Sequence, residues 1–235
     1  MEVPTTLLSQ VDASVGGKLG VDFGGMKNIV GTFVNPQMVI IDPEVLNTLP
    51  EKQLISGFAE VLKHGLIADP LYFDKVCKKL PRDFSSEELV EIIRGSCEIK
   101  ATVVRQDPKE LGLRKILNFG HTVGHAVESL SYETGRVPLL HGEAVAIGMM
   151  AEATLAKQLG MLSANDVAII RSKIVYMGLP IKPDFAIDPA KFWQLVRSDK
   201  KNAAGKVKWV LLKKIGEAVW DIETTKELNF EDLLA

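Results

Sequence analysis

Helical periodicity dominates the pattern of hydrophobic positions after residue 50. Over residues 51–67 apolar side chains recur at helical spacing, directly after Pro50. Ser85 and Glu88 match a capping box, which predicts the start of a helix that ends near Val104. The same periodicity and the usual start and stop residues predict four more helices, at 121–130, at 142–159, from 165 or 166 to 177, and from 189 onward.

Residues 142–159 are the most uniformly apolar of these segments. They are rich in Ala and Met, and Gly160 ends the pattern. A helix that is apolar around most of its circumference has no face suited to water. We therefore expect this helix at the centre of the domain.

Strand patterns occur towards the two ends of the chain. Residues 1–36 are rich in Gly, Ser, Thr and Asp and predict loop with short pieces of structure, while 38–41 fit one buried strand closed by Asp42-Pro43. Alternating residues from 207 and a turn at Ile215-Gly216 predict a hairpin that ends at 222. The predicted fold is mainly α: a single domain over 1–235, with a strand and loop region at 1–50 and a small C-terminal β-hairpin.

Composition and charge argue against some classes of binding partner. A net charge of -2 produces no long-range attraction to nucleic acid or to an anionic membrane, so an anionic ligand must be bound by a local cluster of Lys and Arg. No window approaches the about 18 apolar residues of a membrane helix, and the N-terminus lacks a signal-peptide pattern. Cys77 and Cys97 have no metal-ligand spacing and are expected to be free thiols. We expect a cytoplasmic protein.

Nucleotide-binding motifs are absent from the sequence. No Gly-x-Gly-x-x-Gly lies between a strand and a helix pattern. Gly16-Gly17-Lys18 lacks both the upstream glycine and the following Ser or Thr of a phosphate-binding loop. The chain alone is therefore not expected to form a nucleotide-binding fold.

The histidines are the first candidate chemistry. His121 and His125 share one face of a predicted helix, and His141 directly precedes the central helix. A lone helical histidine is more often structural, but three within 21 residues make a metal or acid/base site an equal alternative. No Glu follows His121, so the metalloprotease signature is excluded.

Glu60 lies within an apolar helical pattern, where a carboxylate is costly unless it is paired. Two interpretations remain open. Glu60 is either a residue on the helix surface, paired with Lys63 or His64, or a metal ligand; spacing alone slightly favours the first.

Several basic and amide side chains occupy unusual positions. They follow paired glycines, interrupt apolar helical patterns, or lie just upstream of His121. An isolated lysine is usually part of a solvated face, but glycine allows a ligand to approach the backbone closely. We interpret the set as an anion pocket beside a metal site for a small anionic substrate. Its members are Lys18, Lys27, Asn28, Lys63, Lys100, Arg114 and Asn118.

Segments over nearly the whole chain resemble the 3-dehydroquinate synthase family, in family order. The most specific are PTTLLSQVDASVGGK at 4–18, GFAEVLK at 57–63, NFGHTVGHAVE at 118–128 and HGEAV at 141–145. Shorter matches lie at 27–28, 96–101, 110–114 and 199–201. The resemblance implies a phosphate-eliminating carbon-oxygen lyase that converts 3-deoxy-D-arabino-heptulosonate 7-phosphate to 3-dehydroquinate in the shikimate pathway of aromatic amino acid biosynthesis. It also implies a homodimer that uses Zn²⁺ or Co²⁺ as a Lewis acid and a recycled NAD.

The same resemblance assigns roles to individual residues. It implies that Glu60, His121 and His141 are the metal ligands and that His125 is the acid/base residue. It implies substrate contacts at Lys18, Asn28, Lys63, Lys100, Arg114, Asn118 and one of Lys200 and Lys201. It implies cofactor contacts at Thr5, Thr6, Asp12, Lys18 and Lys27. His64 is not expected to be a ligand.

In one respect the sequence departs from the family that it resembles. The family's NAD-binding domain lies upstream of the Pro-Thr-Thr segment, where this sequence has only Met1-Glu2-Val3. We therefore expect a partial chain whose residues 1–50 would border that domain, supplied in trans. Three alternatives remain: a sister sugar-phosphate cyclase that makes a deoxy-inosose or valiolone, an inactive truncated metal-binding domain, and a metal-dependent polyol dehydrogenase.

Overall fold

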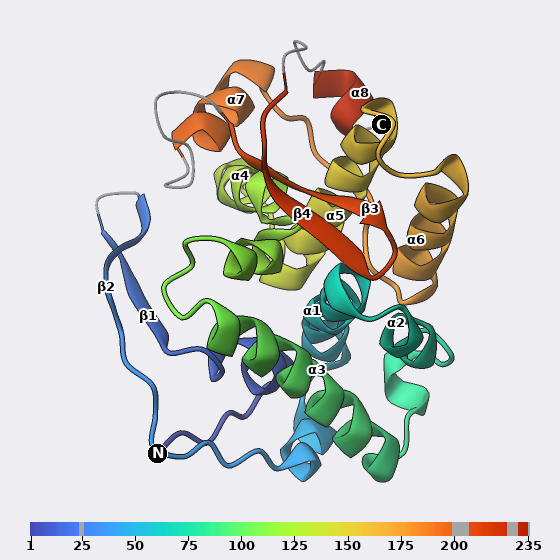
Figure 1. Cartoon of the computed structure of the whole chain (residues 1–235). Helices are drawn as coiled ribbons and strands as arrows, with labels where there is room; N and C mark the ends of the chain where they lie inside the picture. The colour runs from blue at the N-terminus through green and yellow to red at the C-terminus, as the bar shows by residue number, and fades with distance from the viewer. Residues whose placement is uncertain (24–25, 199–206, 225–229, 235) are drawn as a thin grey trace.

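The mainly helical class is confirmed, with a small hairpin near each end of the chain (Figure 1). The computed structural model describes residues 1–23, 26–198, 207–224 and 230–234. The helices are α1 (Glu51–Ala68), α2 (Pro70–Val76), α3 (Ser86–Gln106), α4 (His121–Ser131), α5 (His141–Gln158), α6 (Ala164–Tyr176), α7 (Pro189–Ser198) and α8 (Phe230–Leu234). The strands are β1 (Lys18–Phe23), β2 (Met26–Phe33), β3 (Trp209–Lys214) and β4 (Glu217–Ile222).

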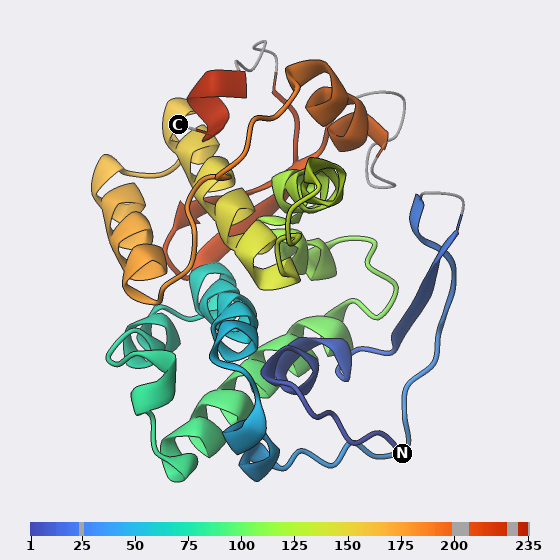
Figure 2. The ribbon, with the colours of Figure 1, turned by 180° about the vertical axis from the view of Figure 1, so that it is seen from behind.

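Helix α5 is the central element, as its all-round apolar pattern predicts. Its residues are almost continuously buried from Gly142 to Ala156. Helices α1, α4, α6 and α8 and strand β3 pack around it (Figures 1 and 2). Over this stretch α5 has almost no solvent face, so a polar residue buried there must find a partner inside the protein.

Helices α4 and α5 pack backbone to backbone. A Cβ atom added at Gly148 would lie 1.8 Å from the carbonyl oxygen of Gly120, so only glycine fits there. Gly120 precedes α4 in a left-handed conformation, with a φ of 81° that favours glycine. This close approach brings the first turn of α4, which carries His121, against the middle of α5.

Helix α1 begins directly after Pro50 and is buried continuously from Ser56 to Ile67. It packs against α2, α3 and α5. Its buried stretch includes Glu60, Lys63 and His64. Of the two interpretations left open for Glu60, a position on the helix surface is therefore wrong, because the helix is covered on that side as well.

Helix α3 starts at the predicted capping box. The Ser85 side chain accepts a hydrogen bond from the Glu88 amide at 3.3 Å, and the Glu88 carboxylate accepts one from the Ser85 amide at 2.8 Å. Residue 12, in a short π-helix at Ser9–Ala13, packs against this helix. Helix α3 thereby fixes the N-terminal segment beside α1.

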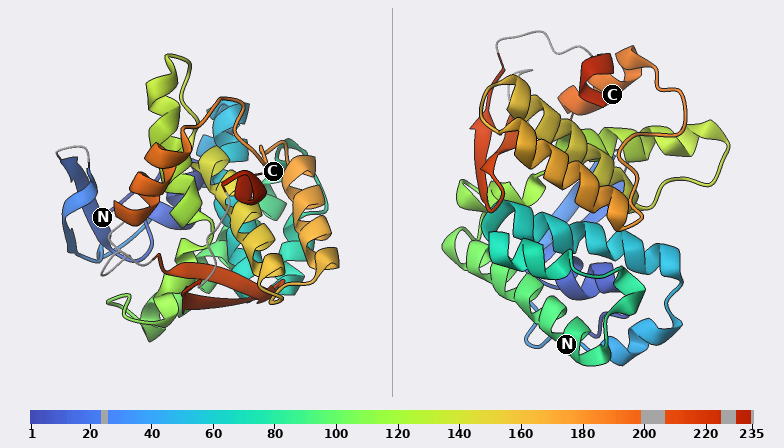
Figure 3. Two further views of the ribbon diagram at one scale, coloured as in Figure 1. Left: turned by 90° about the horizontal axis from the view of Figure 1, so that it is seen from above. Right: turned by 90° about the vertical axis from the view of Figure 1, so that its right-hand side faces the viewer.

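The N-terminal strands differ from the prediction. Strands β1 and β2 form an antiparallel pair that matches Lys18 with Phe33, where loop with short pieces of structure was expected. The predicted buried strand at 38–41 is wrong: Val39 forms one isolated bridge to Glu2, and Met38 and Ile40 are 56% and 44% exposed. Among the described residues, this single bridge is the only strand pairing of the segment, and Met38 and Ile40 therefore stay exposed. Figures 2 and 3 show the β1–β2 hairpin standing off from the helices.

The C-terminal hairpin is confirmed, with β3 and β4 paired around the turn at Ile215-Gly216. The periodicity did not predict α2, whose signal is the Asp69-Pro70 start: the Asp69 carboxylate accepts hydrogen bonds from the Leu71 and Tyr72 amides. Helix α8 was not predicted either. Among the described helices, none has the length and hydropathy needed to cross a membrane.

Both cysteines are free thiols, as expected. Cys77 caps the end of α2 and Cys97 lies in α3. Burial raises the pKa of Cys77 to about 12 and that of Cys97 to about 11, so neither is poised for reaction.

Candidate metal centre and anion pocket

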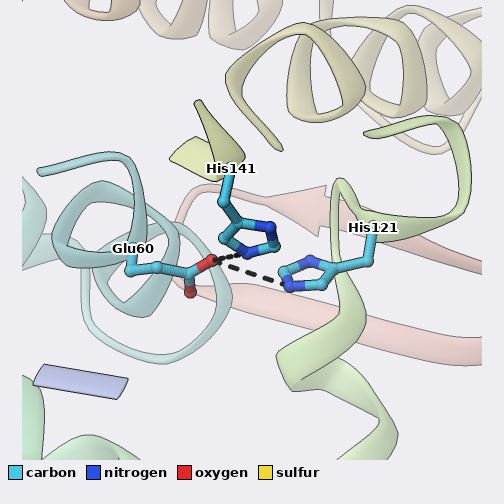
Figure 4. A group of neighbouring side chains, drawn as sticks. All are labelled: Glu60, His121 and His141. Carbon is cyan, nitrogen blue, oxygen red and sulfur yellow. Dashed lines mark ion pairs between the residues drawn. The ribbon is translucent and has the colours of Figure 1, made fainter. Parts of the chain in front are cut away.

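Three side chains from separate helices converge on one point. Oε1 of Glu60 in α1 lies 3.6 Å from Nε2 of His121 in α4 and 3.6 Å from Nε2 of His141 in α5 (Figure 4). The potential ligand atoms of the three residues all lie within 4.8 Å of one another. The packing of α1 and α4 against α5 therefore assembles a carboxylate and two imidazoles that are distant in sequence.

The spacing of these atoms suits a bound divalent cation. A tetrahedral zinc shell with bonds of 2.0–2.1 Å separates its ligand atoms by roughly 3.3 Å, and the two distances of 3.6 Å are longer than hydrogen bonds. Oε1 of Glu60 is fully buried and accepts no hydrogen bond within the described part of the chain. One carboxylate and two imidazoles fit zinc or cobalt and leave coordination positions for other oxygen ligands.

Each histidine is oriented through its other ring nitrogen. Nδ1 of His141 lies 3.4 Å from Oε2 of Glu128, and Nδ1 of His121 lies 3.1 Å from the carbonyl oxygen of Phe119. Metal-binding histidines usually have such a carboxylate or carbonyl partner, which directs Nε2 to the metal. Burial would lower the pKa of His141, but the adjacent carboxylates of Glu128 and Glu60 raise it to about 9.

Glu60 is ionised although it is fully buried. Burial opposes ionisation, but the Lys63 ammonium and His141 together outweigh it and hold the pKa of the Glu60 carboxyl below its usual range. Lys63 is 1% exposed and forms a direct ion pair with Glu60 Oε2. The prediction of Lys63 as a partner of Glu60 is confirmed. Oε2 of Glu60 thus faces the Lys63 ammonium, and Oε1 faces the imidazoles of His121 and His141.

His125 lies beside the triad but outside it. Its ring centroid is 5.2 Å from that of His121 and 6.2 Å from that of His141. It is one turn further along α4 and only half-buried. This position suits a proton-transfer group next to a metal better than a ligand.

Glu110 joins two of the predicted anion-binding residues. Its Oε2 lies 2.5 Å from Nζ of Lys18, and its Oε1 accepts a hydrogen bond of 2.7 Å from Nδ2 of Asn118. Burial lowers the pKa of Lys18, and Glu110 opposes that shift. Through Glu110, Lys18 is therefore held next to Asn118, in the segment that precedes α4.

Lys100 and Asp12 form a second buried pair. Nζ of Lys100 lies 2.6 Å from Oδ1 of Asp12 and donates to the Asp12 carbonyl oxygen. Burial opposes ionisation of Asp12, but Lys100 and Lys63 hold the pKa of that carboxyl well below its usual range. A residue predicted for the cofactor and two predicted for the substrate therefore act on one another electrostatically.

Arg114 is buried at the base of the N-terminal hairpin. Its guanidinium donates to the carbonyl oxygens of Pro108 and Gly16 and lies 5.5 Å from the ring centroid of Phe33. Its Nε has no hydrogen-bond partner among the described residues. The Gly16-Gly17-Lys18 turn and Arg114 are thus in direct contact, as an anion pocket made from both requires.

Among the remaining predicted residues, only Thr5 and Thr6 have described side chains. Thr6 exchanges hydrogen bonds with Ser9, the first residue of the π-helix, and Thr5 is exposed. Lys27 and Asn28 belong to β2 by their backbone. Lys200 and Lys201 lie outside the described residues.

His64 is fully buried behind the triad. Its Nδ1 lies 2.6 Å from Oγ of Ser96, while Nε2 has no hydrogen-bond partner among the described residues. Its nearest acidic neighbours, Asp12 and Glu60, already pair with lysines. A second cation beside them would face two ammonium groups, so His64 does not extend the metal centre.

Two acidic residues of the site were not predicted. Glu110 and Glu128 lie within the recognised segments, but neither stands out from its neighbours by spacing. A weak signal existed for Glu128: it lies seven residues after His121, which is the same side of a helix. The sequence held no signal that Glu110 would bridge Lys18 and Asn118.

Comparisons with known proteins agree with this geometry. The family model for the 3-dehydroquinate synthase C-terminal domain matches residues 57–202, and the N-terminal model matches residues 1–56. The chain is 43% identical over 240 residues to 3-dehydroquinate synthase of Thermodesulfovibrio yellowstonii, covering 99% of this chain and 64% of that protein. It is 46% identical over 221 residues to the Teredinibacter turnerae synthase, covering 93% and 60%. The chain thus spans less than two thirds of the length of these relatives.

Solved structures of sister enzymes share the fold. A 2-epi-5-epi-valiolone synthase from Streptomyces hygroscopicus with NAD⁺ and Zn²⁺ bound aligns with a TM-score of 0.83 and 26% identity, over 98% of this chain and 63% of that one. A 2-deoxy-scyllo-inosose synthase complexed with carbaglucose-6-phosphate, NAD⁺ and Co²⁺ aligns with a TM-score of 0.81 and 27% identity, over 92% and 60%. The match to the C-terminal model covers more than half of the chain, and the sequence motifs and the buried Glu-His-His cluster agree with it. The chain belongs to the 3-dehydroquinate synthase family.

Proposed function

We propose that this chain carries the metal- and substrate-binding part of a 3-dehydroquinate synthase. The reaction would be the phosphate-eliminating cyclisation of 3-deoxy-D-arabino-heptulosonate 7-phosphate to 3-dehydroquinate. The observation that carries the proposal is the placement of Glu60, His121 and His141 around one point, beside a buried group of cations. The 43–46% identity to curated 3-dehydroquinate synthases supports this substrate over others.

The proposed metal ligands are Glu60, His121 and His141, and the metal is Zn²⁺ or Co²⁺. When bound there, such an ion supplies Lewis-acid stabilisation of negative charge on substrate oxygens. The protein's own contribution is to hold the two imidazoles in one orientation through Glu128 and Phe119. His125, half-buried at the edge of the triad, is the proposed acid/base residue.

The proposed substrate contacts combine charge with hydrogen bonding. Four cations would neutralise the carboxylate and phosphate of the substrate, and two amides would bind hydroxyl groups. In the described structure three of the cations are held by carboxylates that a bound anion would displace or share. The residues are Lys18, Lys63, Lys100 and Arg114 for charge, Asn28 and Asn118 as amides, and one of Lys200 and Lys201.

NAD is the second proposed cofactor, with contacts from Thr5, Thr6, Asp12, Lys18 and Lys27. Residues 1–56 match the family's N-terminal model, which supports a border between residues 1–50 and an NAD-binding domain. We propose that this domain, supplied in trans or by a longer chain, completes the cofactor site. We further propose a homodimer that acts in the cytoplasm.

Zinc binding by the purified chain tests the centre. We expect one zinc per chain and a melting temperature that rises with zinc concentration, since a ligand that binds the folded state stabilises it by mass action. Glu60→Ala and His121→Ala should abolish both effects. His125→Ala is the matched control: it removes a neighbouring imidazole that is not a ligand, and zinc should be retained.

Either of two results would contradict the metal centre. The first is a wild-type chain that remains folded and binds no zinc. The second is zinc that stays bound in Glu60→Ala and in His121→Ala. Loss of zinc in His125→Ala together with retention in His121→Ala would reassign the ligand set.

Phosphate release tests the reaction. The chain would be mixed with an NAD-binding domain from a close relative, with NAD and zinc present, and supplied with the seven-carbon acid phosphate or with a sugar phosphate that lacks the carboxylate. Turnover of the acid substrate alone supports 3-dehydroquinate synthase. Turnover only of the sugar phosphate without a carboxylate supports a sister cyclase, the class to which the aligned structures belong. No turnover with either, in a mixture shown to form a complex, supports an inactive metal-binding domain.

A further inference from the structure

Glu152 is a fully buried carboxylate to which neither the sequence pattern nor the proposed reaction gives a role. It lies in α5 within a run of mostly apolar residues. It points to the start of α4, where both of its oxygens accept hydrogen bonds from backbone amides.

Glu152 accepts hydrogen bonds from the backbone amides on both sides of His121. Oε2 accepts from the Gly120 amide at 2.7 Å, and Oε1 accepts from the Thr122 amide at 3.1 Å. The Val123 amide lies 3.4 Å from Oε1. The residues on both sides of His121 are therefore bound to one carboxylate, which restricts the backbone that carries this imidazole.

The first turn of α4 needs such a partner. The first amides of a helix have no acceptor within the helix and usually receive one from a Ser, Thr, Asp or Asn at the N-cap. Here the N-cap is Gly120, which has no side chain, and the helix start is buried against α5. Gly148, one turn before Glu152, allows the close contact that brings the Glu152 carboxylate within reach.

We propose that Glu152 is a positioning residue for the metal centre: it caps α4 from the neighbouring helix and thereby fixes His121 in the orientation that binds the metal. A negative charge at a helix N-terminus is also favourable, because the free amides there carry partial positive charge. The inference rests on the proposed metal centre and adds a residue that does not touch the metal. Loss of a partner of this kind typically lowers metal affinity about 10–100-fold.

The test compares Glu152→Gln with two controls. Glutamine keeps the size but replaces one acceptor by an NH₂ group, which would face an amide donor. Asp69→Asn makes the same chemical change at the start of α2, which carries no proposed site residue. Leu155→Ala, at a fully buried position of α5, lowers stability and leaves the hydrogen bonds of Glu152 to the start of α4 in place. Affinity for Co²⁺ is measured by competition with a chromophoric chelator, together with the visible spectrum of the bound ion, far below every melting temperature.

We expect Glu152→Gln to bind Co²⁺ at least 10-fold more weakly than wild type, with an altered spectrum, and both controls to stay within about two-fold. A Glu152→Gln protein that matches wild type in affinity and spectrum would overturn the positioning role and leave the metal centre intact. Equal weakening in Leu155→Ala would also overturn it, because general loss of stability would then explain the effect. If wild type binds no Co²⁺, the metal centre fails and the positioning role fails with it.

If Glu152→Gln does not fold, hydrogen exchange on the wild-type chain tests the proposal instead. In metal-free protein the Gly120 and Thr122 amides should be protected as strongly as the interior of α5. Exchange of these amides at the rate of an unstructured peptide would overturn the proposal, since the cap would then not exist before the metal binds.

Discussion

His64 shows how a single buried side chain makes stability depend on pH. Burial and the adjacent Lys63 lower its pKa from 6.5 to about 3, and the opposing charges of Asp12 and Glu60 do not compensate. Lys100 adds to the lowering. His64 is therefore neutral in the folded protein wherever the unfolded chain would carry a proton there.

We predict that metal-free protein loses stability as the pH falls from 6.5 towards 3. In that window the unfolded state binds a proton at residue 64 that the folded state excludes, so the free energy of unfolding decreases with falling pH. The His64 contribution at pH 5, relative to pH 8, is about 2 kcal/mol. Urea unfolding at both pH values measures it, and His64→Gln should reduce the difference by that amount. An identical difference in the variant would show that His64 does not titrate in this way.

Glu128 is a second single residue with a testable effect, in this case on the metal centre. Its carboxylate is the partner of His141 Nδ1, so Glu128→Gln should lower zinc affinity about 10-fold. The control is Glu133→Gln, which removes an exposed carboxylate paired with Lys191 and should leave affinity unchanged. Chelator competition measures both. Equal affinities for the two variants would argue that His141 is oriented by packing alone.

At the scale of secondary-structure elements, the packing of α4 against α5 determines how the histidines are placed. These helices supply His121, His125 and His141, and their glycines bring the backbones into direct contact. The distance between the two histidine ligands therefore depends on the separation of the helices. A change of that separation would act on stability and metal binding together.

Gly148→Ala should destabilise the protein and weaken zinc binding, because the added methyl would lie 1.8 Å from the Gly120 carbonyl oxygen. We expect a loss of about 3 kcal/mol in the free energy of unfolding. The control, Gly160→Ala, has a φ of 72° with no atom within 4 Å of the added methyl, and should cost about 1 kcal/mol through backbone strain alone. Denaturant unfolding without metal measures both. Equal losses would refute the close contact as the cause.

At the scale of the whole molecule, exposed apolar side chains gather on the N-terminal segment. They include Leu19, Val21, Val30 and Phe33 of the hairpin, together with Val34, Met38 and Ile40 after it. Figure 3 shows this hairpin apart from the helices, so no described element covers it. Apolar surface of this kind marks a contact with another protein surface.

We predict that the isolated chain self-associates through this surface. Val21 and Val30 are cross-strand partners, 66% and 61% exposed. Val21→Lys with Val30→Glu replaces them by an opposite-charge pair that preserves the hairpin. Sedimentation should show a dimer or larger species for wild type and a monomer for the double variant. Leu71→Lys changes a still more exposed apolar residue on α2 and should leave association intact; a monomeric wild type would refute the prediction.

The sequence by itself determined most of the helices, because their signals are local. The capping box at Ser85, the periodicity after Pro50 and the uniform apolarity of 142–159 depend on neighbours within a few turns, and the structure confirmed each of them. The family motifs likewise pointed to the residues that the structure brings together. The strand at 38–41 was mispredicted, because an apolar run does not reveal whether another strand will pair with it.

Only the tertiary structure decided what the charged residues do. From spacing, Glu60 was a surface residue or a ligand, and α1 became buried on that side only through its packing against α3 and α5. Glu110 and Glu152 carried no local signal, because their partners lie on other segments of the chain. Pairings of this kind depend on which helices pack together and how closely, and neither is encoded in the spacing of residues along one element.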